Sequence, residues 1–341
     1  MTEPLAVVAS TAFGATSSPL VDSAPGSHVA TAQAVVLRDL RRHYEGREAL
    51  TGISLGIREG EIFGLLGPNG AGKTTMLSII STRIRPTGGD VWVFGRHVVD
   101  DVHAVRRLLN VAPQEEALYP ALTGEENLRF FAKLYDVSRA ELGARVAAAL
   151  EAVALTARKS DRVSTYSGGM RRRLNLGCAL VTAPRVLLLD EPTVGVDPQS
   201  RQYIFDAIRG LRADGMTVVY TTHHLEEAEN LCDRIAILDE GRVVALGTLP
   251  ELLALSHAKE VIDLRLAQPP GSVAAVEALD GVHGVEVVGA EVRIFTTWAA
   301  GVMTRLCGTP PLLDQPIVQL RVSPVTLHDV FIELTGKGLR D

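Results

Sequence analysis

The pattern of apolar and polar positions divides the chain into three parts. Residues 1–33 are rich in Ala, Ser, Thr, Pro and Gly and show almost no charge or apolar periodicity. Such a segment cannot bury enough surface to order itself, so we expect a disordered tail. Between residues 34 and 250, apolar runs of buried-strand character alternate with segments of helical spacing, which predicts an α/β domain. Residues 251–341 alternate on a smaller scale and are expected to form an accessory domain.

Two regions of the middle part depart from this alternation. Val35–Leu37 and Ala49–Ile57 are strand-like runs broken by glycines, which predicts an antiparallel β-region beside the main core. Residues from about 115 to 183 have helical spacing, and Thr123–Glu126 and Ser138–Glu141 both have the sequence of a capping box. We therefore predict a helical insertion there.

The last part has strand and helix patterns in the order β-α-β-β-α-β, which is the ferredoxin-like arrangement. The runs are Val261–Leu266, Ser272–Leu279, Val285–Val288, Val292–Thr296, Ala299–Cys307 and Ile317–Val322. A final helix is predicted at Thr326–Leu334. No catalytic constellation is found in this α+β segment.

The clearest chemical signal is a nine-residue stretch between a predicted strand, Glu61–Leu66, and a predicted helix. It fits the P-loop pattern G-x-x-x-x-G-K-[ST]. Its residues are Gly67, Pro68, Asn69, Gly70, Ala71, Gly72, Lys73, Thr74 and Thr75. The loop would lie at a helix N-terminus, where backbone N–H groups attract phosphate. Lys73 would supply a charge to the β- and γ-phosphates, and Thr74 a hydroxyl to Mg²⁺.

Two further strands end in candidate catalytic residues. The continuous apolar run Val186–Leu189 predicts a strand buried on both faces, and it leads into Asp190 and Glu191. Ligands bind at the carboxyl ends of such strands, where a P-loop enzyme needs a carboxylate for Mg²⁺. Val218–Thr222 repeats the arrangement before His223 and His224. Since adjacent side chains project differently, we expect at most one histidine to face the site.

Ser167 is predicted to be the N-cap of another helix, with Arg171–Arg173 in its first turns. Cations are not expected at that end of a helix. An anion held at Ser167 and the following glycine N–H groups would remove the conflict. The alternative, that each arginine is simply solvated, stays open.

Composition narrows the possible functions. A formal net charge of −6 and a pI near 5.9 argue against a dedicated nucleic-acid binder. The three cysteines, Cys178, Cys232 and Cys307, have no metal-ligand spacing and are predicted to be small buried residues in a reducing compartment. No apolar stretch approaches the ~20 residues that span a bilayer. Because the N-terminus lacks a positive segment, we expect no signal peptide.

The ordered set of motifs resembles an ABC-type ATPase over about Ala34–Thr248. The resemblance implies a P-loop NTPase core with an antiparallel β-subdomain and a helical insertion. Three stretches, YSGGMRRR at 166–173, TTHHLEEAE at 221–229 and TLHDVFIELTG at 326–336, resemble ATP-binding subunits of drug and antibiotic exporters of the daunorubicin-resistance kind. The first stretch departs from the common Leu-Ser-Gly-Gly-Gln pattern at Tyr166 and Met170.

The resemblance implies a role for each matching residue. Tyr44 would stack on adenine, and Asp190 would hold Mg²⁺. Gln114 would sense Mg²⁺ and the attacking water and link the site to a membrane partner. Glu191 would be the catalytic base, and His223 would contact the γ-phosphate.

The resemblance also implies partners. Ser167, Gly168 and Gly169 would close on ATP held by the P-loop of a second subunit, and Asp197 belongs to a loop that crosses to that subunit. We therefore expect a homodimer with two ATP molecules, bound to a separate transmembrane permease at the cytoplasmic face of the membrane. No nucleic acid is expected. The alternatives are a soluble ABC-type ATPase that acts on ribosomes or DNA, and an importer ATPase.

Overall fold

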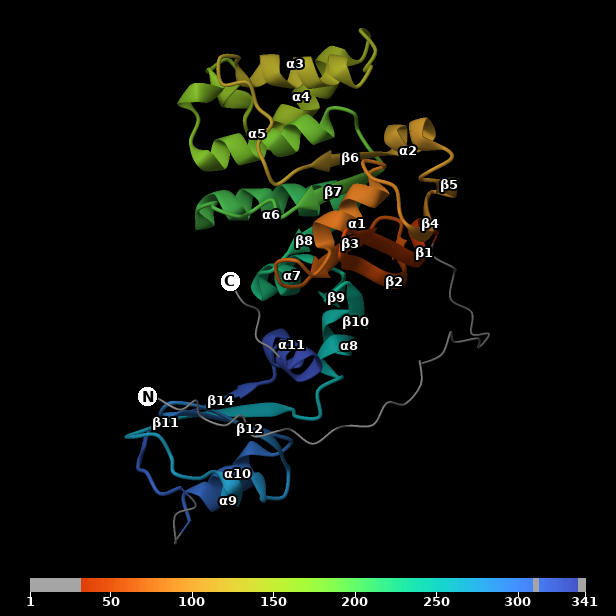
Figure 1. Ribbon diagram of the computed structural model, residues 1–341. Helices are drawn as coiled ribbons and strands as arrows, with labels where there is room; N and C mark the ends of the chain where they lie inside the picture. The colour runs from red at the N-terminus through yellow and green to blue at the C-terminus, as the bar shows by residue number, and fades with distance from the viewer. Residues whose placement is uncertain (1–31, 309–312, 337–341) are drawn as a thin grey trace, which may run out of the picture. The chain divides into compact units, whose positions relative to one another are not determined.

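A six-stranded sheet of order β10-β9-β3-β8-β7-β6 carries the P-loop in the computed structural model, which describes residues 32–308 and 313–336 (Figure 1). Its strands are β3 Ile62–Leu66, β6 Leu109–Ala112, β7 Val186–Asp190, β8 Thr217–Thr222, β9 Arg234–Asp239 and β10 Arg242–Gly247. All pairs are parallel except β9–β10. The strands β3, β7 and β8 are buried along their whole length, as their continuous apolar runs predict.

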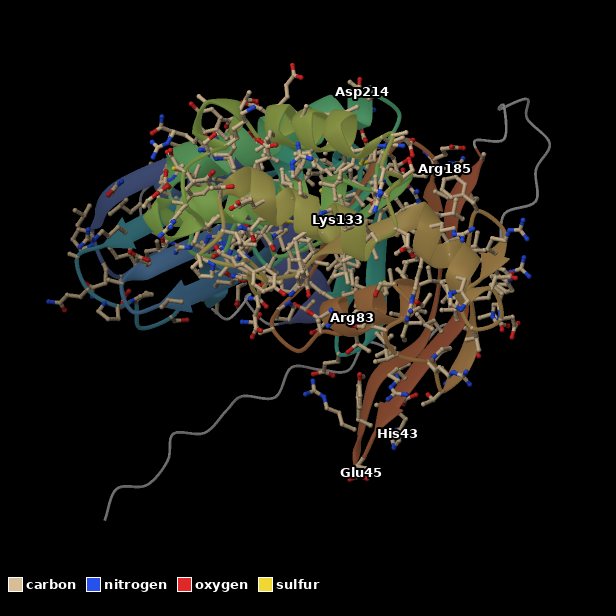
Figure 2. The ribbon with its side chains drawn as sticks, turned by 90° about the horizontal axis from the view of Figure 1, so that it is seen from above. His43, Glu45, Arg83, Lys133, Arg185 and Asp214 are labelled. Atoms are coloured by element: carbon tan, nitrogen blue, oxygen red, sulfur yellow. The ribbon has the colours of Figure 1, made fainter. Side chains whose placement is uncertain are left out.

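A second, antiparallel sheet of order β2-β1-β4-β5 confirms the predicted β-region. Its strands are β1 Gln33–Tyr44, β2 Arg47–Arg58, β4 Gly88–Val93 and β5 Arg96–His97. One apolar cluster joins this sheet to β3 and to α1 (Lys73–Ile80), the helix after the P-loop. Figure 2 shows His43 and Glu45 at the tip of the β1–β2 hairpin, which also carries Tyr44. Of the tail predicted at residues 1–33, residues 1–31 lie outside the described part.

The predicted helical insertion contains α3 Gly124–Leu134, α4 Leu142–Ala152 and α5 Gly168–Leu180, which pack together (Figure 1). Thr123 forms the predicted capping box of α3. The capping box predicted at Ser138 forms only in part. Glu141 N donates to Ser138 Oγ at 3.3 Å, but the Glu141 carboxylate binds the Ser138 hydroxyl at 2.8 Å, and α4 begins only at Leu142.

Four more α-helices belong to this part of the fold, namely α2 Val102–Leu108, α6 Pro198–Ala213, α7 Leu225–Leu231 and α8 Leu249–Leu253. Two short 3₁₀ helices, Thr156–Arg158 and Val163–Thr165, lie between α4 and α5. The sequence pattern does not predict α2. Among the described residues, no helix combines the length and the apolar character that a membrane crossing requires.

The C-terminal segment has the predicted element order. It comprises β11 Glu260–Leu266, α9 Ala274–Glu277, β12 Val282–Val288, β13 Glu291–Thr296, α10 Ala299–Leu306 and β14 Ile317–Pro324. The strands form an antiparallel sheet of order β12-β13-β11-β14. The last helix, α11 Leu327–Thr335, packs against β3, β9, α7 and α8. The domain boundary at residue 250 stays a prediction.

The cysteines only partly match expectation. Cys178 is buried, Cys232 is partly buried and Cys307 is exposed. The prediction for Cys307 is wrong because α10 ends at Leu306, its last buried residue, and Cys307 follows as the C-cap.

Candidate functional site

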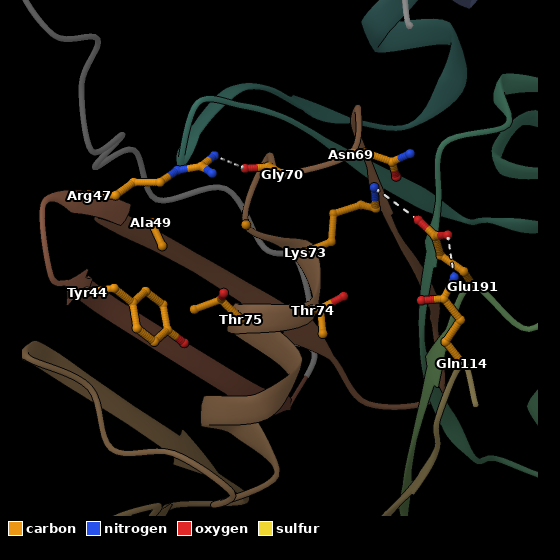
Figure 3. Close-up of a pocket in the computed structure, with 11 residues that line it drawn as sticks. Tyr44, Arg47, Ala49, Asn69, Gly70, Lys73, Thr74, Thr75, Gln114 and Glu191 are labelled. Atoms are coloured by element: carbon orange, nitrogen blue, oxygen red, sulfur yellow. Dashed lines mark hydrogen bonds and ion pairs between the residues drawn. The ribbon is translucent and has the colours of Figure 1, made fainter. Parts of the chain in front are cut away.

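The P-loop borders a cavity of about 260 Å³. Its lining residues are Tyr44, Arg47, Ala49, Asn69, Gly70, Gly72, Lys73, Thr74, Thr75, Gln114 and Glu191. Figure 3 shows Tyr44 and Arg47 on one side of Lys73, with Glu191 and Gln114 on the other. The cavity therefore brings residues from the β1–β2 hairpin, the P-loop and the ends of β6 and β7 to one place.

Glycine is required where the loop enters the helix. Gly72 is the N-cap of α1 and has φ of 106°, in the left-handed region. A Cβ there would lie 2.7 Å from Leu50 Cδ2 and 2.8 Å from the Ala49 carbonyl oxygen. Because no side chain caps α1, its first N–H groups are available to an anion. The sequence pattern thus produces a phosphate-binding geometry.

Lys73 is held at the inner end of the cavity. Its side chain is 5% exposed, and its Nζ donates to the carbonyl oxygens of Gly67 at 2.7 Å and Pro68 at 3.1 Å. Nζ also lies 3.2 Å from Glu191 Oε1. The lysine is therefore positioned as a buried cation whose nearest counter-charge is Glu191.

Three predicted residues converge on the Glu191 carboxylate. Besides Lys73, His223 Nδ1 lies 3.2 Å from Oε1, and Gln114 Nε2 donates to Oε2 at 3.4 Å. Burial works to raise the pKa of Glu191, but Lys73 and His223 outweigh it, and the pKa lies below the usual value. Glu191 is therefore ionised near neutral pH and can accept a proton. Its φ of 45° places it in the left-handed region, so the chain turns sharply after β7.

Oxygen atoms gather beside the P-loop. Asp190 Oδ1 accepts hydrogen bonds from Thr74 Oγ1 at 3.2 Å and from Thr221 Oγ1 at 2.9 Å. A hydroxyl and a carboxylate are hard oxygen donors of the kind that Mg²⁺ prefers. Among the described residues, no group of three or more His, Cys, Asp or Glu could hold a metal by itself. The donors therefore fit Mg²⁺ that shares its coordination with phosphate oxygens.

Sequence reasoning missed two lining residues of the cavity, Arg47 and Ala49, and Arg47 makes a polar contact at its outer end. Tyr44 is 41% exposed, and the Arg42 guanidinium lies 4.5 Å from its ring centroid. Arg47, the direct cross-strand partner of Tyr44, donates to the Gly70 carbonyl oxygen at 3.0 Å. The short hairpin between the two residues is the sequence signal that could have placed Arg47 beside Tyr44.

Several predicted residues lie outside this cavity. Ser167 is the N-cap of α5, with Oγ accepting from Met170 N, and Gly168 and Gly169 follow it. Asp197 is the N-cap of α6, and the hydrogen bond from Ser200 lowers its pKa. None of these residues lines the cavity. The starts of α5 and α6, which carry these residues, lie against each other instead. A Cβ built on Gly169 of α5 would be only 1.9 Å from Oγ of Ser200 in α6.

The cavity lining also lacks Asp190, His223, His224 and the P-loop residues Gly67, Pro68 and Ala71. The ring centroids of His223 and His224 are 4.1 Å apart, and only His223 reaches Glu191. One histidine therefore contacts the proposed catalytic carboxylate, although neither lines the cavity, and the role of His223 stays a prediction.

The three arginines Arg171–Arg173 differ in their surroundings, and the solvated alternative is wrong for Arg172 alone. Arg172 is buried and donates to the carbonyl oxygens of Gln114 and Val194. Arg171 pairs with Glu116 at 3.0 Å, and Arg173 donates to the carbonyl oxygen of Val153 at 3.3 Å. The arginine side chains turn toward carbonyl oxygens and a carboxylate of other segments, so their charges do not lie against the start of the helix. Binding of an anion at Ser167 stays a prediction.

Comparisons of the sequence with known proteins identify relatives that bind ATP. The family model described as "ABC transporter" matches residues 50–194. The linearmycin resistance ATP-binding protein LnrL of Bacillus subtilis (strain 168) is 39% identical over 306 residues, covering 89% of this chain and 98% of that protein. The daunorubicin resistance ATP-binding protein DrrA3 of Streptomyces coeruleorubidus is 38% identical over 311 residues, covering 90% and 97%. The Nod factor export ATP-binding protein I of Ralstonia nicotianae is 33% identical over 317 residues, covering 93% and 98%.

Solved structures give the same result for the cassette. The dimeric ATP-binding cassette MJ0796, in a post-hydrolysis state bound to ADP and Pi, has a TM-score of 0.57 and 30% identity, covering 63% of this chain and 98% of that one. An ATP-binding subunit of an ABC transporter has a TM-score of 0.59 and 32% identity, covering 65% and 92%. The chain therefore belongs to the ABC transporter ATP-binding family, whose cassettes are ATPases.

Proposed function

We propose that this protein is the ATP-hydrolysing subunit of an exporter, and that it drives efflux of a drug, antibiotic or other hydrophobic compound through a separate membrane permease. It would act as a peripheral protein at the cytoplasmic face of the membrane. The observation that carries the ATPase part is the convergence of Lys73, Gln114 and His223 on Glu191, beside the uncapped start of α1. Export is supported by relatives that are named for linearmycin resistance, daunorubicin resistance and Nod factor export.

The cavity suggests how ATP would bind. The P-loop N–H groups and Lys73 would hold the β- and γ-phosphates, and Tyr44 would stack on adenine at the outer end. Thr74, Asp190 and Gln114 would hold Mg²⁺, which neutralises charge on the phosphates. Lys73 Nζ now lies 3.2 Å from Glu191 Oε1, so a bound γ-phosphate would compete with the Glu191 carboxylate for the lysine.

Releasing Glu191 from Lys73 would prepare the site for hydrolysis. Glu191 would take a proton from water as the water oxygen attacks the γ-phosphorus in line, and the bond to the β–γ bridging oxygen breaks. His223, 3.2 Å from Glu191, would contact the γ-phosphate and keep the carboxylate oriented. Catalysis then consists of positioning and charge stabilisation.

We further propose that a second copy of the chain completes the site. Ser167 and Gly168 are exposed at the start of α5, a helix start that can attract phosphate, but they do not line the cavity. A homodimer would bring the α5 start of one chain to the P-loop of the other and enclose two ATP molecules. In this proposal residues 34–250 are the nucleotide-binding domain and residues 251–341 an accessory domain.

Glu191→Gln tests the catalytic assignment. Because the amide cannot take up the proton, we expect ATP hydrolysis to fall by about 10²-fold or more, with ATP binding retained. Phosphate release gives the rate, and a fluorescent nucleotide analogue gives the affinity. Asp214→Asn, at an exposed residue after α6, is the matched control and should keep the wild-type rate. Wild-type turnover by Glu191→Gln would remove Glu191 as the base.

Affinity purification from detergent-solubilised membranes tests the transport assignment. We expect the tagged full chain to recover a polytopic membrane protein from the solubilised membrane fraction. The same purification from a membrane-free extract should not recover it. Recovery of ribosomes without any membrane protein would contradict the exporter proposal and favour a soluble ATPase.

A further inference from the structure

A buried polar cluster includes close sequence neighbours of Glu191 and His223, the two residues proposed to perform hydrolysis. It consists of Glu227 on α7, Thr193 in the segment after β7, and Tyr220 and Thr222 on β8. These four side chains are at most 2% exposed. We call them the Glu227 cluster. None of its members lines the cavity, and the proposed chemistry gives them no role.

All three hydroxyl groups of the cluster donate to one carboxylate. Thr193 Oγ1 lies 2.8 Å from Glu227 Oε1, and the hydroxyls of Tyr220 and Thr222 each lie 2.8 Å from Oε2. Arg201 Nε of α6 lies 3.6 Å from Oε1 and offsets the buried charge. Burial, and next the Glu227 carboxylate, raise the pKa of Tyr220 well above its usual value, so this phenol is a neutral donor.

The cluster connects the segments that carry the reacting groups. Thr193 follows Glu191 by two residues, and Thr222 immediately precedes His223. The side chains of Glu191 and His223 meet at 3.2 Å. Glu227, from a third element, therefore joins the two segments that carry Glu191 and His223, through the hydroxyls of Thr193 and Thr222.

Burying a carboxylate in the core costs free energy, because the group loses its hydration. Replacing such polar groups by apolar ones of similar volume is often neutral or stabilising, so packing alone does not explain the cluster. A fully satisfied hydrogen-bond network does fix a unique local geometry. Its directional bonds fix the position of Thr193, in the segment after β7, relative to Thr222 at the end of β8.

We propose that Glu227 is a positioning residue for ATP hydrolysis: by binding Thr193 and Thr222 together, it fixes the distance between Glu191 and His223. The inference rests on the proposed function of these two residues. It requires the Glu227 cluster to affect the chemical step while ATP binding at the P-loop stays intact.

The first test is Glu227→Gln in the full chain, with Glu226→Gln as the control. Glu226 is exposed on the same helix and belongs to neither the cavity nor the cluster. Glutamine keeps the size of the side chain but puts an N–H₂ group where a hydroxyl now donates. Because small misplacements of catalytic groups are costly, we expect kcat for ATP to fall by about 10- to 100-fold. The KM and the affinity for ATP should stay within about twofold, since the P-loop is unchanged.

A second pair of variants separates positioning from folding. Thr193→Val keeps the shape and removes the donor, whereas Thr193→Ser keeps the donor. We expect the valine variant to lose kcat in the same way and the serine variant to recover at least half of the wild-type kcat. Thermal unfolding of all variants shows whether each is folded. A role limited to stability would shift the melting temperature without this split between kcat and KM.

The possible outcomes are distinct. Wild-type kcat in folded Glu227→Gln and Thr193→Val would overturn the positioning role and leave the proposed function intact. A rise in KM at unchanged kcat would also overturn it. If the wild-type chain itself hydrolysed no ATP, or if Glu191→Gln kept full turnover, the proposed function would fail and this inference with it.

Discussion

At the scale of single residues, the neighbouring glycines that open α5 have very different surroundings. A Cβ on Gly169 would lie 1.9 Å from Ser200 Oγ and 2.4 Å from Ser200 Cβ, so α5 and the start of α6 must separate to admit it. A Cβ on Gly168 would meet only Arg171 Nη2, at 3.9 Å. The buried Gly169 is therefore needed for the packing of α5 against α6, whereas packing does not require a glycine at the exposed position 168.

We therefore expect Gly169→Ala to lower the free energy of unfolding by about 1–3 kcal/mol through overpacking. Gly168→Ala is the matched control, since it adds the same methyl group one residue earlier. It should leave stability unchanged or raise it by less than about 1 kcal/mol, because alanine favours the helix. Urea-induced unfolding followed by circular dichroism measures both. Equal midpoints for the two variants would contradict this view of the α5–α6 contact.

Lys73, Asp190 and Glu191 could be named as candidate site residues because each lies in a motif that is local in sequence, and their roles stay predictions. Arg172 could not, because its partners are carbonyl oxygens of Gln114 and Val194, which are brought to it only by the packed fold. A run of three arginines has the same appearance in sequence whether it faces water, an anion or buried backbone. The chemistry of a charged residue depends on such long-range partners.

At the scale of elements, α11 is attached to the rest of the fold by two kinds of contact. Leu327 and Phe331 pack in an apolar cluster with Leu66 of β3. Asp329, 2% exposed, accepts a hydrogen bond from Thr326 N at 2.8 Å and pairs with Arg293 of β13 at 2.7 Å. One carboxylate thus caps the helix and ties it to the C-terminal sheet.

The charge on Asp329 should make this attachment depend on pH. Burial works to raise the pKa of Asp329, but hydrogen bonds from Thr326 and the Arg293 guanidinium outweigh it, and the pKa lies below its usual value. A carboxylate with a depressed folded-state pKa stabilises the fold above its unfolded pKa of about 3.9, and the contribution is lost as pH falls through the folded value. We expect Asp329→Asn to cost about 1–3 kcal/mol near pH 7 and less below about pH 4.

Urea unfolding across this pH range measures the effect. Asp280→Asn is the matched control, because Asp280 is exposed, and it should cost almost nothing at any pH. A loss in Asp329→Asn that is equally large at pH 7 and well below pH 4 would show that shape, and not charge, is responsible.

Element types were predictable where one period extends over a whole segment, as in β7 and β8, whose continuous apolar runs form fully buried strands. The helix α2 was missed because Val105 is its one buried residue, so it shows no apolar stripe. Ser138 shows a second limit, since a capping-box sequence does not decide which of its hydrogen bonds forms. Local patterns suggest elements, and packing selects their ends.

At the scale of the whole molecule, the two features that the sequence predicts to bind phosphate do not line one cavity. The P-loop lines the cavity with Lys73 and Glu191, while Ser167 and Asp197 begin two helices outside it. The order of the motifs along the chain does not reveal this separation. The order would be the same if one chain formed a whole site or if two chains each supplied half of it. The described fold therefore agrees with the proposed dimer, in which each chain supplies half of two sites.

Mixing two inactive variants tests that proposal. Lys73→Ala removes the phosphate-binding cation, and Ser167→Arg blocks the start of α5, so each homodimer has two broken sites. A mixed dimer has one intact site, made from the P-loop of the Ser167→Arg chain and the α5 start of the Lys73→Ala chain. If both variants pair randomly, half of the dimers are mixed and each has one of two sites, so about a quarter of wild-type ATP hydrolysis should return. Phosphate release from the separate and mixed samples measures it. Activity that stays absent in a mixture of folded, dimerising variants would mean that each chain completes its own site.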